Sequence, residues 1–370
     1  MKKRRIKLLI GCFITSASII CIAYLCNVFF TNAAVTPKYP KDYASTQEYI
    51  NVLREESFED LVAEVNKIGT KCSYEDLTYY AQALQEKRAG ISDAVLEELY
   101  FAKSSSLYLK RIILEFSMDE NQPILLDFDR VSSDFLKEKD VEQRMMILSY
   151  LGSGCTYAND ERYAELIGSM LSTEKDDIIL SRLISSYYYI DKEKTISICN
   201  SILNNFNASE ITYTQRQALT RIAWSLQDGT EEEIEKFILL CDDMLRKTGD
   251  ADAVCYPLVE TYQPAAVKYV LKNDKFDDML KSGCVYKNYN ALCKIANMPA
   301  SEENYRLIAY AMRLTPLIEM EEQIDLMISN NKTILNEHRE LLQELNDAIA
   351  MIRQSGIHHW NWENPLEEKT

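Results

Sequence analysis

The fold is decided by three six-residue stretches that share one pattern: Leu166-Ile167-Gly168-Ser169-Met170-Leu171, Ile198-Cys199-Asn200-Ser201-Ile202-Leu203 and Leu240-Cys241-Asp242-Asp243-Met244-Leu245. A shorter match, Asp277-Asp278-Met279-Leu280, repeats the end of the third stretch. The apolar residues stand at i, i+1, i+4 and i+5, which is one face of a helix. Successive copies are 32, 42 and 35 residues apart, with a second helical segment between them, such as 177–190 or 211–226. A two-helix unit of this length cannot bury its own apolar face, so neighbouring units must stack.

In period and pattern, residues 140–300 resemble the HEAT and tetratricopeptide class of helical repeats. Trp224 is not followed by the Leu-Gly and Tyr positions that the tetratricopeptide signature requires, so the irregular spacing fits HEAT-like repeats better. The resemblance implies architecture only and assigns no functional residue. Chance similarity among leucine-rich helices is the alternative. We therefore predict an all-α chain of stacked antiparallel helix pairs, an α-solenoid.

Glycine and proline are scarce, with 10 and 8 residues in a chain of 370, which favours long helices joined by short links. Ser57 and Asp60 resemble a capping box and predict a helix start. We expect the helical-repeat body over 46–316, a C-terminal helical cap over 317–356 and a polar tail over 357–370. In the cap, a single long helix is predicted from Asn330 or Asn331 to about Gln354, because apolar residues recur there every seven positions.

The N-terminus has the pattern of a membrane anchor or an export signal. Residues 1–7 are a basic leader, and residues 8–30 are uncharged and apolar, long enough as a helix to cross a bilayer. The basic leader predicts a cytoplasmic N-terminus with the rest of the chain outside. We expect a single-pass protein of the cell membrane, with residues 31–45 as a spacer. Secretion after signal cleavage is the alternative, since Thr31-Asn32-Ala33-Ala34 offers a small-residue cleavage site.

The formal net charge of −16 argues against nucleic acid as a partner. Residues 1–34 hold five basic and no acidic residues, so the remaining 36 basic and 57 acidic residues give the rest of the chain a charge of −21. Such a surface repels phosphate backbones, and no basic stripe interrupts it.

The sequence contains no motif that by itself specifies an enzyme, a cofactor site or a metal site. It has no phosphate-binding glycine loop and only three histidines, so we predict no cofactor and no bound metal. The segment His358-His359-Trp360-Asn361-Trp362-Glu363 is unusual; it is either a weak metal-binding or docking tail, or a place where the tryptophans fold back on a helix. Seven cysteines follow residue 34, which we interpret mostly as buried thiols, with a Cys284–Cys293 disulfide as the alternative.

Tyrosine is abundant, with 23 residues, and Tyr187-Tyr188-Tyr189 covers three directions of one helix. At least one of these rings should be exposed or lie at a junction between repeats. Tyrosine supplies a large amphipathic contact area, so we predict Tyr187, Tyr188 and Tyr189 as the contact surface of a scaffold that binds a protein or peptide. The alternative for these rings is that they fill the space between helices. The alternative function is an exported all-helical hydrolase or lyase that uses a tyrosine and one of the carboxylate pairs Asp127/Asp129, Asp242/Asp243, Asp250/Asp252 or Asp277/Asp278.

Overall fold

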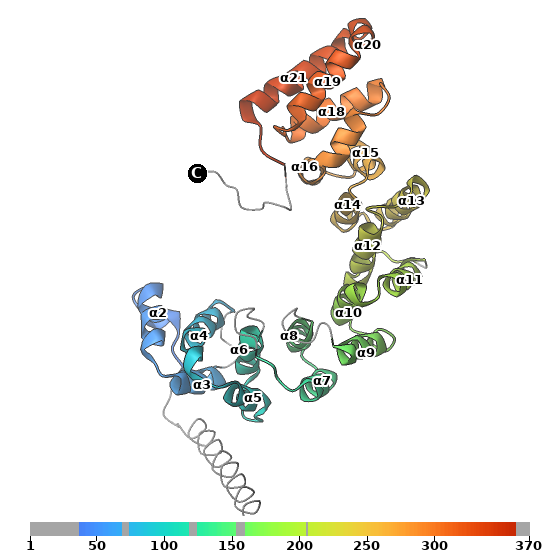
Figure 1. Ribbon diagram of the computed structural model, residues 1–370. Coiled ribbons are helices and arrows are strands. Elements are labelled where there is room, and N and C mark those ends of the chain that lie inside the picture. Colours follow the sequence, from blue (N-terminus) through green and yellow to red (C-terminus); the bar gives the residue numbers. More distant parts are fainter. Residues whose placement is uncertain (1–36, 69–73, 118–123, 153–159, 205, 360–370) are drawn as a thin grey trace, which may run out of the picture. The chain divides into compact units, whose positions relative to one another are not determined.

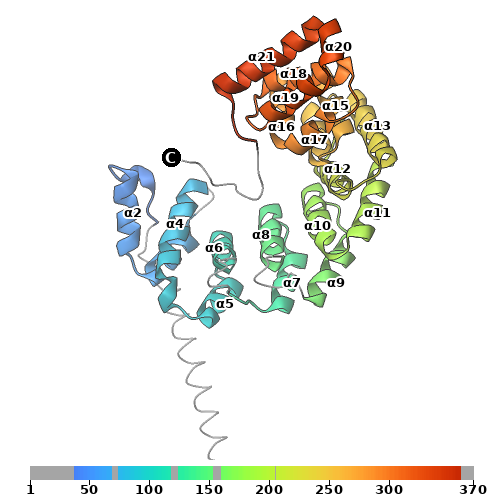
Figure 2. The ribbon, with the colours of Figure 1, turned by 45° about the horizontal axis from the view of Figure 1, so that its top comes forward.

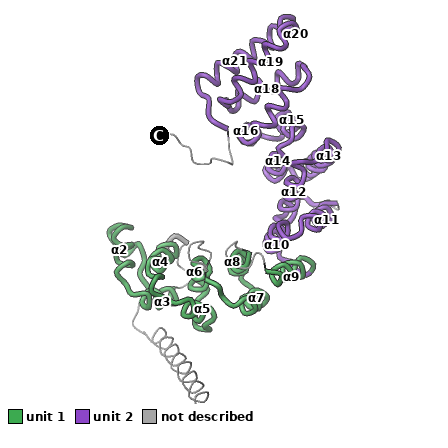
Figure 3. Tube along the Cα trace, in the orientation of Figure 1, with its two compact units in different colours: residues 1–172 green, residues 173–370 purple. Residues whose placement is uncertain are grey.

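The computed structural model describes residues 37–68, 74–117, 124–152, 160–204 and 206–359. Within these ranges the regular structure is helical, and the one extended pairing is an isolated parallel bridge between Leu317 and Ile357. The predicted all-α fold is therefore confirmed. The chain divides into two compact units, residues 1–172 and 173–370 (Figure 3).

Unit 1 is built from short amphipathic helices that pack mainly on near neighbours in the chain. Among its contacts, α4 packs against α2 and α3, while α6 packs against α3, α5 and α8 (Figure 1). The elements are η1 (Pro40–Asp42), α2 (Thr46–Glu55), α3 (Phe58–Lys67), α4 (Tyr74–Lys87), η2 (Arg88–Gly90), α5 (Asp93–Phe101), α6 (Leu107–Ser117), α7 (Phe128–Lys137), α8 (Val141–Leu151) and α9 (Glu161–Met170).

Unit 2 arranges its helices in two rows. Each of α10, α12, α14, α16 and α18 contacts the next member of that series, and α13, α15, α17 and α19 form a second such series. The first row can be followed in Figure 1 and, turned by 45°, in Figure 2. This packing is compatible with a helical-repeat architecture. The elements are α10 (Asp177–Ile190), α11 (Lys192–Leu203), α12 (Tyr213–Ser225), α13 (Glu231–Thr248), α14 (Ala251–Glu260), α15 (Pro264–Lys272), α16 (Asp278–Lys287), α17 (Tyr289–Ala296), α18 (Glu302–Leu314), α19 (Met320–Asn330), α20 (Lys332–Glu337) and α21 (Arg339–Ser355).

The three complete copies of the repeated pattern lie on α9, α11 and α13, except that Leu171, the last residue of the first copy, is the C-cap of α9. Their buried residues are Ile167 in α9, Cys199 and Leu203 in α11, and Cys241, Met244 and Leu245 in α13. The prediction that the fourth, shorter match repeats this buried face is wrong. It falls on the first turn of α16, where Asp277 caps the helix and the Met279 side chain is 75% exposed.

Side-chain caps fix many helix starts, as the sequence predicts for α3. Ser57 Oγ accepts a hydrogen bond from the Asp60 amide at 3.1 Å. Two full capping boxes begin α12, with Thr212 and Gln215, and α13, with Thr230 and Glu233. At the other end of α13, Gly249 adopts φ 71°, a left-handed conformation that costs glycine little.

The predicted single helix of the C-terminal cap is broken. α20 ends and α21 begins at His338, which has φ −116° and ψ 69° and serves both helices as a boundary residue. Asn331 and His338 interrupt the apolar seven-residue row, so a straight helix would carry polar side chains into the packed face. The break lets Leu335 be buried while α20 packs against α21. The long final helix is therefore α21 alone.

The predicted leader and apolar segment, residues 1–30, lie outside the described residues, as does the tail from 360 onward. Of the helices that the structure describes, none combines the length and apolarity that a membrane crossing requires. The predicted boundaries of spacer, body, cap and tail stay predictions. The structure differs from the prediction in the segment expected to be a spacer. Lys38, a described residue of that segment, contacts Glu64 of α3 and Tyr80 of α4.

Candidate functional site

The three tyrosines predicted as a contact surface have different environments at the C-terminal end of α10. Tyr187 is 6% exposed and belongs to the core, whereas Tyr189 is 74% exposed. Tyr188 is half-buried, with its ring perpendicular to that of Tyr189 at a centroid distance of 5.8 Å. The expectation that at least one ring is exposed is confirmed, and Tyr188 and Tyr189 are the two that reach the surface.

An arginine from the next helix in the row joins these rings. The Arg221 guanidinium of α12 lies 5.1 Å from the ring centroid of Tyr188, 5.4 Å from that of Tyr189 and 4.1 Å from that of Trp224. Tyr188 and Trp224 are themselves in edge contact at 6.0 Å. A cation held over several aromatic faces is attracted by the ring quadrupoles. The cluster therefore links α10 to α12 through a buried charge.

A second cluster of charged and aromatic side chains lies on and beside α14 and α16 and contacts the Arg221 cluster through Trp224. The Glu260 carboxylate, 3% exposed, accepts a hydrogen bond from Trp224 Nε1 at 3.2 Å and forms an ion pair with Lys287 Nζ at 3.0 Å. The Lys287 ammonium also lies 5.0 Å from the ring centroid of Tyr256, which is 49% exposed. Tyr262 donates to Glu260 at 3.4 Å from a backbone with φ 53°, a strained conformation for a bulky residue.

These side chains form a continuous chain of contacts, partly buried and partly exposed, that we call the aromatic–ionic stripe. It runs along the C-terminal ends of the first-row helices α10, α12, α14 and α16. Its members are Tyr188, Tyr189, Arg221, Trp224, Tyr256, Glu260, Tyr262 and Lys287. Burial alone would lower the pKa of Lys287, but its hydrogen bond with Glu260 and the Glu260 charge together outweigh this and raise it. Burial and the Glu260 charge raise the pKa of Tyr256.

Sequence reasoning found Tyr188 and Tyr189 and missed the charges of the stripe. Arg221, Glu260 and Lys287 look like ordinary surface residues in a chain that is 26% charged. The spacing in the sequence could have pointed to Glu260, because Tyr188, Trp224 and Glu260 follow one another at intervals of 36 residues. In a repeat protein, equal spacing places residues at equivalent positions of successive helices.

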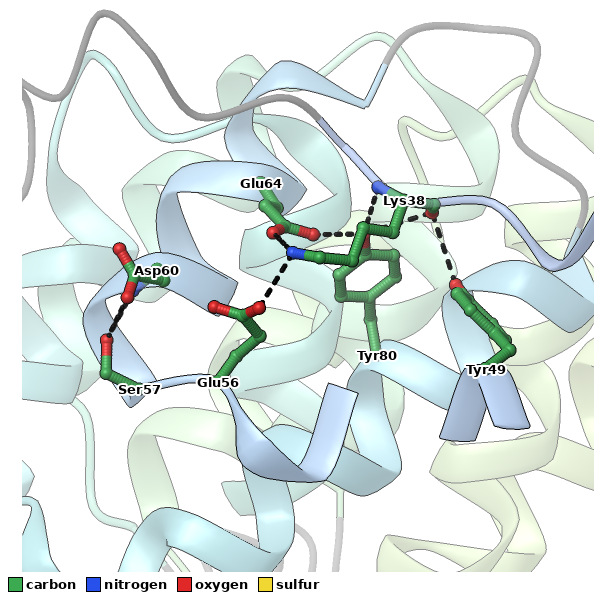
Figure 4. A network of polar contacts seen from close by, with 7 residues as sticks. All are labelled: Lys38, Tyr49, Glu56, Ser57, Asp60, Glu64 and Tyr80. Carbon is green, nitrogen blue, oxygen red and sulfur yellow. Dashed lines mark hydrogen bonds and ion pairs between the residues drawn. The ribbon is translucent and has the colours of Figure 1, made fainter. Parts of the chain in front are cut away.

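Unit 1 carries a separate buried polar network around Lys38 (Figure 4). The Glu64 carboxylate is 1% exposed; it pairs with Lys38 Nζ and accepts from Tyr80 Oη at 2.5 Å. Lys38 Nζ also reaches Glu56 at 3.0 Å, and its backbone N–H donates to Tyr80 Oη at 2.9 Å. Tyr49 donates to the Lys38 carbonyl at 3.3 Å. Every contact here fixes the chain to the first helices, so we assign the network a structural role.

The carboxylate pairs proposed for a hydrolase serve mainly as caps and ion-pair partners. Asp127 caps α7 and Asp277 caps α16. Asp250 caps α14 and pairs with Arg216 at 2.6 Å. Asp243 pairs with Lys247 at 2.8 Å. These contacts hold the carboxylates at helix ends and on helix faces.

The two histidines of the C-terminal segment contact one carboxylate. His358 Nδ1 lies 2.8 Å and His359 Nδ1 3.2 Å from Glu319 Oε1, and the His359 ring stacks on Tyr289 at 4.4 Å. Burial alone would raise the pKa of Glu319, yet the hydrogen bonds with His358 and His359 lower it below its ordinary value. Across the described ranges, no group of three or more His, Cys, Asp or Glu side chains could hold a metal ion. Trp360 and Trp362 lie outside those ranges.

The described cysteines are free thiols. Cys199, Cys241, Cys255 and Cys284 are buried, and Cys293 is half-buried, so Cys284 and Cys293 do not form the disulfide considered above. Burial raises the pKa of Cys199 and of Cys255 to about 12. For Cys199, Cys241, Cys255 and Cys284 the interpretation as buried thiols is confirmed.

Comparison with known proteins identifies no family. No family model matches the chain, and neither does any curated protein. One solved structure, described as a computational design of self-assembling cyclic protein homooligomers, aligns with 84% of this chain and 98% of its own length at 13% identity. Its TM-score is 0.14, which is too low to support an argument about fold or function.

Proposed function

We propose that this protein is a scaffold that binds a protein or peptide through the aromatic–ionic stripe of unit 2. The observation that carries the proposal is the continuity of the stripe over four successive first-row helices, with Tyr189 and Tyr256 exposed at 74% and 49%. Exposed tyrosines beside arginine and tryptophan are the residue types that contribute most to binding at protein interfaces. Stacked repeats present such residues along an extended surface.

Two further features belong to the same proposal. The two-row packing of unit 2 and the irregular period support a HEAT-like α-solenoid. The basic leader and the apolar residues 8–30 support a single membrane anchor with the helical units outside the cytoplasm. The alternative of an exported hydrolase or lyase has no comparable observation in its favour.

The binding role is tested by site-specific photocrosslinking in intact membranes. A photoreactive phenylalanine analogue replaces Tyr189 or Tyr256 in the stripe, and Tyr213, which is 62% exposed at the start of α12, serves as the control. We expect one defined crosslinked band from positions 189 and 256 and none from 213. Equal crosslinking at all three positions, or none at any, would contradict the proposal. Tyr187 is left unchanged because its ring belongs to the core.

A further inference from the structure

Arg221 is the most unusual group in the stripe, because its charge is buried and lacks an acidic partner. The residue is 4% exposed, and of the carboxylates in the described residues none lies within ion-pair distance of it. Its Nη2 donates to Ser185 Oγ, and its Nε can donate to the side-chain oxygen of Gln217 at 2.7 Å. Its Nη1 has no hydrogen-bond acceptor.

A buried guanidinium with an unused donor is costly, since a buried charge normally needs a partner of opposite sign. Burial lowers the pKa of Arg221, and interaction with the Tyr189 hydroxyl offsets only part of this effect. Glu260 does not serve as the partner, because it is already paired with Lys287 and bonded to Trp224. The site therefore holds an uncompensated positive charge.

The surroundings of Arg221 add to this positive charge. Lys192 Nζ lies 6.0 Å from the ring centroid of Tyr188, and Lys194 Nζ lies 5.4 Å from that of Tyr187. Neither ammonium pairs with a carboxylate of the described residues. The neighbouring Asp191 accepts a hydrogen bond from the Lys194 backbone N–H as the cap of α11. Lys192 and Arg221 thus share the half-buried Tyr188 ring, and Lys194 lies over the neighbouring Tyr187 ring, in a chain whose net charge is −16.

We propose that Arg221 is the anchor for a carboxylate of the bound peptide, so that the stripe selects peptides with an aspartate or glutamate next to apolar residues. This inference rests on the proposed binding function and adds the chemistry of the ligand. The carboxylate enters where the Tyr189 ring covers the guanidinium, and that ring can rotate because it is 74% exposed. The peptide carboxylate accepts hydrogen bonds from Arg221, while Tyr188 and Trp224 contact the apolar residues that flank it in the peptide.

The test is a selection of ten-residue peptides, displayed on phage, against the purified full-length chain. We expect the selected peptides to be enriched in aspartate or glutamate at one position. The best peptide is then resynthesised with Asn or Gln in place of the acid, and binding is measured by fluorescence anisotropy. The neutral peptide should bind at least tenfold more weakly, because a charge-assisted hydrogen bond to a buried group is lost. This comparison needs no variant of the protein.

Two variants assign the preference to Arg221. In R221M the acidic and neutral peptides should bind equally weakly, whereas R216M, on the same helix but 45% exposed and paired with Asp250, should keep the full preference. If R221M does not fold, R221K is used, and its acidic-to-neutral ratio should fall between one and the wild-type value.

The failure of this inference can be told apart from the failure of the proposed function. Peptides selected without any acidic preference, or a preference that R221M retains, would overturn the role of Arg221 and leave the binding function standing. If no peptide is selected and Tyr189 gives no photocrosslink, both are overturned.

Discussion

Replacement of Lys38 by methionine tests whether the buried network of unit 1 holds α3 and α4 together. The substitution removes the ammonium group that pairs with Glu64 and keeps most of the aliphatic stem. Glu64, 1% exposed, then keeps the Tyr80 hydroxyl at 2.5 Å as its remaining hydrogen-bond partner. Removal of one member of a fully buried pair costs about 3–5 kcal/mol. Because the Lys38 side chain is 23% exposed, water compensates in part, and we expect a loss of about 2–3 kcal/mol.

Hydrogen exchange of the full chain measures this loss locally, without the assumption that both units unfold together. The protection of core amides in α3 and α4 should fall roughly 30- to 150-fold in K38M, which corresponds to the expected free energy. Protection in unit 2 should not change. The control is R54M, which removes an exposed ion pair with Glu86 and should cost about 0.5 kcal/mol or less. Equal small effects in K38M and R54M would refute the assignment of a buried, stabilising pair.

A double-mutant cycle separates the ion pair from the rest of the network. In K38M/E64Q no charge remains buried, and glutamine still accepts from Tyr80. We therefore expect the double variant to be more stable than K38M by about 1 kcal/mol or more. Additive effects would show that the Lys38 and Glu64 charges are not coupled.

The same network makes unit 1 sensitive to alkaline pH. Burial alone would lower the pKa of Lys38, but its hydrogen bonds with Glu64 and Glu56 raise it above the ordinary 10.5. Burial and the hydrogen bond to Glu64 raise the pKa of Tyr80 above 10.0. Both groups hold their proton more tightly when folded, so their stabilisation is complete below pH about 10 and is lost as the pH rises further. Urea unfolding at pH 8.0, 9.5 and 10.5 should show this loss, and K38M should lose less than the wild type.

Three other positions give separate expectations. G249A should lower the stability of α13 by about 1 kcal/mol or more, since alanine disfavours φ 71°; an unchanged melting temperature would refute this. Iodoacetamide at pH 8 should modify Cys293 well before Cys241, which is fully buried; modification of Cys241 first would contradict the packing. The Ile357 amide should lose exchange protection as the pH falls below about 4.5. The pKa of Glu319 is lowered in the folded chain, so the ionised carboxylate stabilises this segment above the ordinary pKa of glutamate, and protonation removes that stabilisation. E319Q should abolish this pH dependence.

The sequence predicted well those features that depend on local pattern. Apolar spacing placed the complete repeat copies on helices, and Ser57 with Asp60 predicted the start of α3, because both follow from the geometry of a single helix. The prediction failed where packing between different segments of the chain determines the local structure. Met279 fits the repeated pattern, but it lies on a first helical turn that faces solvent. His338 stands inside a helical pattern, yet packing of α20 against α21 breaks the helix there.

Buried charges are the hardest features to predict from one sequence, and Glu64 and Arg221 show why. Each is buried by contacts with residues 16 to 36 positions away, and neither has a local signature. The two differ in how completely they are satisfied. The Glu64 carboxylate has a partner on each oxygen, Lys38 on one and Tyr80 on the other, so nothing further is needed to explain its burial. The Arg221 guanidinium has aromatic faces, a hydroxyl and an amide oxygen but no opposite charge, and one of its nitrogens is unused. A charge that the chain itself neutralises stabilises the fold, whereas a charge left without its counterpart beside exposed rings is better explained by a carboxylate that another molecule supplies.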